Sequence, residues 1–120
     1  MEFATLISYL FHSRTQTHIF HLQTPSFAAH KALDDYYSGI VDLIDSYAEM
    51  AQGRYGIIKG YTSVNMEIFE DNNPVKYFIG LQKFVDNIRQ TLPQDGELNN
   101  TVDEISGLIS STIYKLKFLK

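Results

Sequence analysis

Five side chains of metal-binding type occur in a short stretch of this sequence at regular spacing. His30 and Asp34 lie four residues apart, which is one helical turn, and Asp45 and Glu49 repeat that spacing. His18 precedes His30 by twelve residues. A ligand set of imidazoles and carboxylates suits Fe(II), Mn(II) or Zn(II) better than Ca or Mg, which prefer oxygen ligands alone. Singly, such residues are typical of packed histidines and solvated acidic faces, but their joint spacing indicates transition-metal chemistry.

Two helices joined by a tight turn are expected to carry these residues. Apolar residues recur at helical spacing from about residue 2 to residue 22. A second helix follows and ends near Gly53, because glycine suits a helix C-terminus. Between the two helices, Thr24 is predicted to be the N-cap and Pro25 the first helical residue.

The position of the turn decides which residues of the two helices lie side by side. His18 lies six residues before Thr24 and His30 six residues after it, so an antiparallel pair of helices would bring the two imidazoles side by side. Asp34 would follow one turn further on, completing half of a metal site within one chain. The remaining carboxylate pair begins eleven residues later, at Asp45, which is about 16 Å along the helix axis at 1.5 Å per residue.

A second copy of the chain can close that gap. The midpoint between His30 and Glu49 coincides with the midpoint between Asp34 and Asp45, so two antiparallel copies of the second helix would bring each pair together. Gly39 lies beside this two-fold axis, where a missing side chain would allow a close approach. Each site of the predicted dimer would use both chains: His18, His30 and Asp34 from one, Asp45 and Glu49 from its partner.

The second half of the chain predicts another helical pair. Helical spacing breaks down over residues 54–72, which we interpret as a long crossover with a short helical piece at residues 63–69. A third helix is expected from Asn73 to Pro93. The last helix begins either at a capping box formed by Thr101 and Glu104, or earlier, near Glu97.

This order of elements predicts an all-α protein with a single domain over residues 1–120. Two helical hairpins joined by a long crossover between the second and third helices describe a ferritin-like four-helix bundle. The length of 120 residues and the 44% of hydrophobic residues suit one packed core.

Composition excludes several classes of function. The net charge of −4 argues against broad binding to nucleic acid or to anionic membranes. The absence of cysteine excludes disulfides, thiolate zinc sites and cysteine catalysis. No apolar run approaches the roughly 20 residues that cross a bilayer, and the N-terminal residues lack the basic region of a secretory signal. We therefore expect a cytoplasmic protein.

The segment from His18 to Glu49 resembles the Dps family, the miniferritins also called DNA-protecting proteins from starved cells. The family's diagnostic stretch has a His, a second His twelve residues later, an Asp four residues on, and then Asp-x-x-x-Glu. Here it reads THIFHLQTPSFAAH, HKALD and DSYAE. All five iron-ligand positions carry the expected residue type, although the matching part is about a quarter of the chain.

The resemblance implies a dodecameric shell of four-helix subunits with iron as its substrate. Fe(II) would bind at inter-subunit sites, be oxidised by hydrogen peroxide or oxygen, and be stored as ferric mineral. His18, His30 and Asp34 would come from one subunit, and Asp45 and Glu49 from its two-fold mate. Zn or Mn would be the alternative metals.

The sequence also departs from the family. Ile19 stands where the family usually has Trp, and Met50 replaces a basic residue after the last ligand. DNA-binding members often use Lys-rich tails, which this chain lacks, so DNA binding is not expected. The alternatives are a non-catalytic structural or assembly protein that keeps the bundle, including a viral one located in the host cytoplasm, and a di-metal bundle of the oxygenase type.

Overall fold

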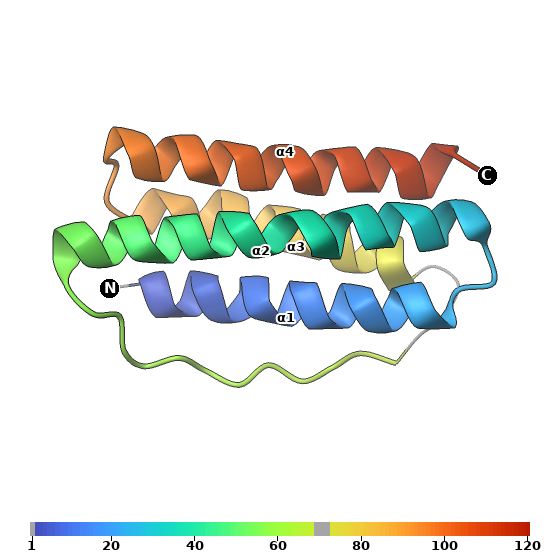
Figure 1. Cartoon of the computed structure of the whole chain (residues 1–120), viewed down its shortest axis with the longest axis horizontal. Helices are drawn as coiled ribbons and strands as arrows, with labels where there is room; N and C mark the ends of the chain where they lie inside the picture. Colours follow the sequence, from blue (N-terminus) through green and yellow to red (C-terminus); the bar gives the residue numbers. More distant parts are fainter. Residues whose placement is uncertain (1, 69–72) are drawn as a thin grey trace.

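The computed structural model describes residues 2–68 and 73–120, and within them it contains four α-helices and no strands. The helices pack lengthwise into a bundle whose principal extents are 43 × 26 × 22 Å (Figure 1). They are α1 (Phe3–Gln23), α2 (Phe27–Tyr55), α3 (Asn73–Ile88) and α4 (Gly96–Phe118), with a short 3-10 turn at Arg89–Thr91. The expected all-helical architecture is confirmed.

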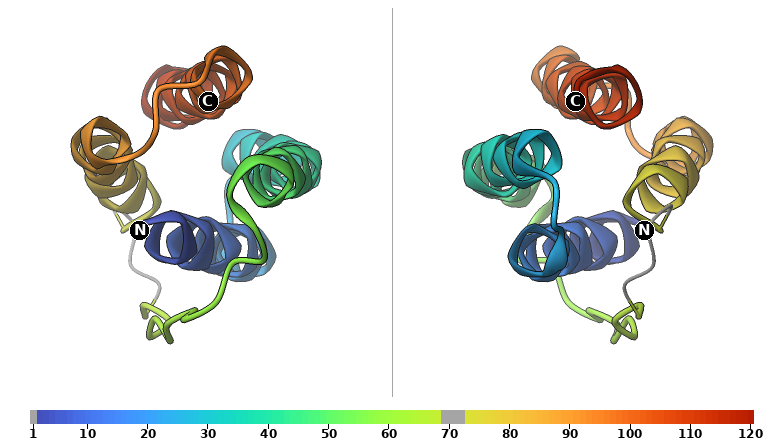
Figure 2. Two further views of the ribbon diagram at one scale, coloured as in Figure 1. Left: turned by 90° about the vertical axis from the view of Figure 1, so that its left-hand side faces the viewer. Right: turned by 90° about the vertical axis from the view of Figure 1, so that its right-hand side faces the viewer.

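The direction of each helix follows from the connections. Tight turns make α1 antiparallel to α2 and α3 antiparallel to α4, whereas the long connection returns along the bundle, so α2 and α3 run in the same direction (Figure 1). Viewed along the bundle, the helices occupy four corners in the order α1, α2, α4, α3 (Figure 2). The predicted crossover between the second and third helices is therefore present.

The core contains large aliphatic and aromatic side chains from all four helices. Among the most buried are Leu6, Leu10, Leu33, Ile40, Ile44, Phe78, Val85, Ile105 and Ile109. Tyr36 is also fully buried, and its hydroxyl lies 2.7 Å from Ser13 Oγ. Because Ser13 already donates to the Leu10 carbonyl, the Tyr36 hydroxyl is the donor, and the buried phenol is satisfied. None of the helices in the described ranges is long and apolar enough to cross a membrane.

The start of α2 differs from the prediction at Thr24. Ser26 is the N-cap, since its Oγ accepts a hydrogen bond from the Ala29 backbone N–H at 3.2 Å. Thr24 Oγ1 instead accepts from the N–H of Ser26, and Pro25 precedes the helix. The predicted cap was wrong because two candidate hydroxyls stand two residues apart, and only Ser26 reaches the first turn.

The end of α2 differs from the prediction, and the start of α4 decides between the two predicted positions. Helix α2 continues to Tyr55, and its C-cap is Gly56, with φ of +93°, rather than Gly53. Helix α4 begins at Gly96, which supports the earlier of the two predicted starts. Thr101 lies inside the helix and donates to the Glu97 carbonyl, so the capping box does not form.

The connection after α2 is extended and lies along α1. Ser8 Oγ accepts from the N–H of residue 62 at 3.0 Å, and His12 Nε2 donates to the carbonyl of residue 65 at 2.7 Å. Gln16 exchanges two hydrogen bonds with the main chain of residue 67. Residues 63–68 are consequently not helical, and the short helix predicted there was wrong; Phe69 lies outside the described residues.

Candidate metal centre

His21 and His30 face each other across the turn between α1 and α2. Their rings are stacked, with centroids 3.6 Å apart and an interplanar angle of 22°. Each ring also bonds to the main chain of the other residue: His21 Nδ1 lies 2.7 Å from the His30 carbonyl oxygen, and His30 Nδ1 lies 2.9 Å from that of His21. The two residues thus form a reciprocal pair that fixes both imidazoles.

These hydrogen bonds define which nitrogen of each ring carries a proton. A carbonyl oxygen only accepts hydrogen bonds, so Nδ1 must be the N–H donor in both His21 and His30. In the neutral form, Nε2 then keeps its lone pair. Metal-binding histidines commonly donate their other ring N–H to a carbonyl or carboxylate in this way, which orients the coordinating nitrogen.

His18 lies one turn before this pair, beside a tyrosine of α2. Its ring stacks on Tyr37 with centroids 4.2 Å apart and an interplanar angle of 12°, and it meets His21 edge-on at 5.9 Å. Desolvation raises the pKa of Tyr37, and the neighbouring Asp34 carboxylate raises it further. Asp34 also accepts a long hydrogen bond, 3.4 Å, from the hydroxyl of Ser38.

The pairing of histidines across the hairpin differs from the expectation. His30 contacts His21, not His18, because the hairpin is centred between Pro25 and Ser26 and not at Thr24. That displacement moves His18 about one turn along α1 from the ring it was expected to meet. His21, which is not one of the five predicted ligands, is buried and is the direct partner of His30.

The second carboxylate pair lies on the outer face of α2. Asp45 and Glu49 are both exposed, and neither has a hydrogen bond or ion pair within the described ranges. Helix α2 is continuous from Phe27 to Tyr55, so the predicted separation between Asp34 and Asp45, about 16 Å, is maintained. The two acidic groups cannot share an ion within one chain.

Gly39 lies on the side of α2 that faces α4 of the same subunit. A Cβ built on Gly39 would lie 3.4 Å from a terminal methyl group of Leu108 on α4. An added Cβ would therefore point toward α4 of the same chain and would make an ordinary van der Waals contact there. A two-fold contact beside Gly39 would have to use the neighbouring outward residues of α2, such as Ser38 and Asp42, which are exposed.

No three histidine or acidic side chains in residues 2–68 and 73–120 converge in an arrangement that could hold a metal ion. The structure thus brings His18, His21, His30 and Asp34 to the same end of the α1–α2 hairpin without closing a site around them. This arrangement provides imidazole and carboxylate donors that require further ligands, and the five-ligand assignment stays a prediction.

Comparisons with known proteins place the chain in a family. Neither the curated proteins nor the solved structures contain a match to this sequence. One family model matches residues 21–116, a span that includes His21, His30, Asp34 and the Asp45–Glu49 pair but begins after His18. Because the match covers most of the chain, the protein belongs to DUF5856, a family of unknown function.

Proposed function

We propose that this protein is an iron-binding ferroxidase and iron-storage protein of the Dps type. Fe(II) would bind at sites shared by two copies, with His18, His30 and Asp34 from one chain and Asp45 and Glu49 from its partner. The observation that carries the proposal is the arrangement of α2. One continuous helix presents His30 and Asp34 in its first half, and in its second half an exposed carboxylate pair, Asp45 and Glu49, that has no partner in the described residues.

The donor chemistry supports this assignment. The Nδ1 of His30 is engaged by a carbonyl, which leaves Nε2 oriented and available for a metal. Asp45 and Glu49 are free to change between one and two coordinating oxygens because nothing in the described part of the chain holds them. A mixed imidazole and carboxylate set suits Fe(II), and it would also accept Zn(II) or Mn(II).

The connectivity of the bundle is a second argument. A four-helix bundle with one long crossover is the ferritin-like pattern, in which metal sites lie on facing helices. The crossover between α2 and α3, and the parallel direction of these two helices, fit that pattern. A closed shell in the cytoplasm, dodecameric as in the Dps family, is the assembly that the proposal entails.

The reaction is a two-electron reduction of peroxide by two ferrous ions. Each Fe(II) loses one electron, the O–O bond of hydrogen peroxide breaks, and two protons complete two water molecules. The carboxylates offset the charge that the iron gains on oxidation. With oxygen as the oxidant, the first two electrons would yield peroxide.

A second candidate function follows from exposed apolar side chains on the same hairpin. Phe11 is 48% exposed, Leu22 is 71% exposed and Phe27 is 78% exposed, all on α1 or at the start of α2. Such residues favour burial against another chain. A non-catalytic assembly protein that uses this face, without iron chemistry, would also account for them.

Anaerobic loading with Fe(II) followed by hydrogen peroxide distinguishes these functions. The proposal expects rapid growth of the near-ultraviolet ferric absorbance in the wild type. Loss of that absorbance growth is expected in Asp34→Ala, but not in Asp86→Asn, which removes an exposed carboxylate of α3 outside the ligand set. An assembled wild-type protein that oxidises iron no faster than buffer would instead support the assembly function.

A further inference from the structure

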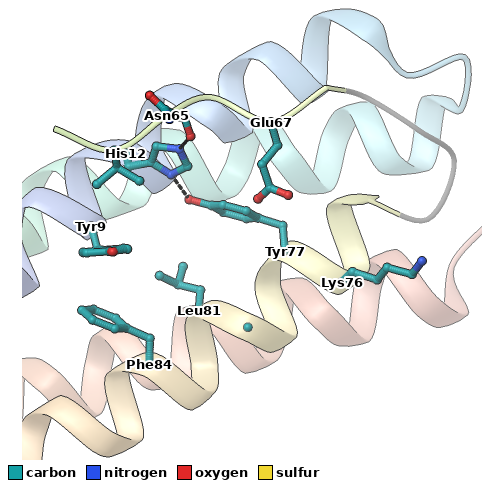
Figure 3. A pocket seen from close by; sticks show the side chains of 10 residues that line it. Tyr9, His12, Asn65, Glu67, Lys76, Tyr77, Leu81 and Phe84 are labelled. Atoms are coloured by element: carbon teal, nitrogen blue, oxygen red, sulfur yellow. Dashed lines mark hydrogen bonds between the residues drawn. The ribbon is translucent and has the colours of Figure 1, made fainter.

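A cavity lies on the side of α1 that faces away from α2, between α1, the crossover and α3. Its volume is about 290 Å³, and it opens at the surface. Aromatic and aliphatic side chains make up most of its wall: Tyr9, Val64, Tyr77, Leu81 and Phe84. Figure 3 shows Tyr9 and Phe84 together at one side, and Tyr77 reaching across from α3 toward His12.

His12 and Tyr77 form a hydrogen-bonded chain whose direction can be assigned. His12 Nε2 lies 2.7 Å from the carbonyl oxygen of Asn65, so Nε2 must carry a proton. In the neutral ring, Nδ1 is then an acceptor, and it lies 2.6 Å from the hydroxyl oxygen of Tyr77. Tyr77 therefore donates its only O–H to His12, and its oxygen retains only lone pairs for any other contact.

The Tyr77 hydroxyl keeps its proton. Desolvation strongly raises the pKa of Tyr77, so the phenol stays protonated at neutral pH. His12 is itself buried, at 6% exposure. A molecule that enters the cavity and meets Tyr77 must consequently supply a hydrogen-bond donor, because a second acceptor would find no proton there.

The remaining walls define the size and polarity of the occupant. The rings of Tyr9 and Phe84 lie 4.4 Å apart at 30°, and they present an aromatic wall with Leu81 next to it. A Cβ built on Gly80 would meet no heavy atom within 4 Å, so the helix backbone leaves this side open. A cavity of about 150 Å³ is enough for one benzene ring. The 290 Å³ found here therefore admits two fused rings.

The charged groups at the rim do not favour an ion. Lys76 and Glu67 both line the cavity and are exposed, and they carry opposite charges. We propose that this cavity binds a small, neutral, planar aromatic molecule of about two fused rings, whose N–H or O–H donates to the Tyr77 hydroxyl oxygen. This site is independent of the proposed iron chemistry, which uses other residues.

Indole and benzofuran test the proposal as a matched pair of ligands. They have nearly the same shape, but indole carries an N–H donor where benzofuran carries an acceptor oxygen. We expect indole to bind one site with a dissociation constant of about 0.1–1 mM, as befits so small a ligand. Benzofuran should bind about three- to tenfold more weakly, the usual range for one hydrogen bond. Because the protein has no Trp, indole fluorescence reports the ligand directly, and calorimetry measures both compounds.

Two substitutions and a matched control locate the binding. Gly80→Leu places a side chain in the cavity and should abolish binding, whereas Gly107→Leu, at an equally open glycine of α4, should leave it unchanged. Tyr77→Phe should remove the preference for indole over benzofuran, and helical content and thermal unfolding report whether each variant folds. The proposal is overturned if wild-type protein shows no saturation by indole up to about 10 mM, a concentration ten times the weakest constant expected. Equal affinity for the two ligands, or full binding by folded Gly80→Leu, would overturn it as well.

Discussion

Mixing two variants that are each expected to be inactive provides the sharpest test of the proposed iron site shared between two chains. Asp34→Ala and Asp45→Ala each remove one predicted ligand, so each variant alone should lose about 100-fold or more in ferroxidase rate, since even outer partners of metal ligands are worth 10–100-fold. In a mixed dimer, one site lacks both carboxylates and the other has every ligand intact. Activity should therefore return when the two inactive proteins are combined.

The size of the recovery follows from the symmetry. Random exchange between equal amounts of the two variants puts about half of all dimers in the mixed form, and each mixed dimer has one intact site out of two. The mixture should recover about a quarter of the wild-type rate. Sites formed within one chain predict none, because every chain would carry one of the two substitutions.

Asp34 and Asp45 of one chain are too far apart to bind the same ion. Ligand oxygens bind iron-sized divalent metals at about 2.0–2.2 Å, so two of them on one ion lie within about 4.5 Å of each other. Along continuous α2, Asp34 and Asp45 are separated by about 16 Å. The assay is the initial rate of ferric absorbance after subunit exchange, with mixed dimers verified by native mass spectrometry. Verified mixed dimers without activity would refute the division of ligands between chains.

Three further predictions concern the elements that position the site. Ser26→Ala should lower the free energy of unfolding by about 1 kcal/mol in urea denaturation through loss of the α2 cap, and Thr24→Ala by less, because only Ser26 bonds to the first turn. Gly56→Ala should also cost about 1 kcal/mol, since φ there is +93°, whereas Gly53→Ala inside the helix should be neutral or stabilising; equal effects would contradict the observed helix end. Burial raises the pKa of Tyr47 to about 12, so the native state holds that proton while the unfolded chain releases it near pH 10. The urea midpoint should then fall between pH 10 and 12, and Tyr47→Phe should reduce that fall, which an unchanged pH profile would refute.

The bundle itself was predictable because its signals are local. Apolar residues at helical spacing mark each helix, and the loss of that spacing after residue 54 marks the crossover. The form of the crossover was not predictable in the same way. Residues 63–68 have a sequence compatible with a helical turn, but their main chain bonds instead to His12 and Gln16 of α1. Those bonds connect residues about fifty positions apart, and no local pattern reveals them.

In the candidate site, the residue that caps α2 decides which histidine of α1 contacts His30. Thr24 and Ser26 are both acceptable caps by composition, and the sequence alone does not rank them. Choosing Ser26 moves the centre of the hairpin by one and a half residues, and this movement exchanges His18 for His21 as the partner of His30. The spacing of the other four predicted ligands, His30, Asp34, Asp45 and Glu49, is unchanged because all four lie on α2.

The same displacement gives His21 a defined part in the proposed iron site. The main-chain carbonyl of His21 fixes the His30 ring, and the His21 ring covers one face of it. These contacts limit the directions from which a metal could approach His30 Nε2. His18, held flat against Tyr37, would have to rotate away from that ring to join His30 on one ion. Iron binding should therefore unstack His18 from Tyr37 while leaving the His21–His30 pair in place. In the proposed site the α1–α2 hairpin would serve as a fixed half, and Asp45 and Glu49 of a second copy would supply the groups that complete it.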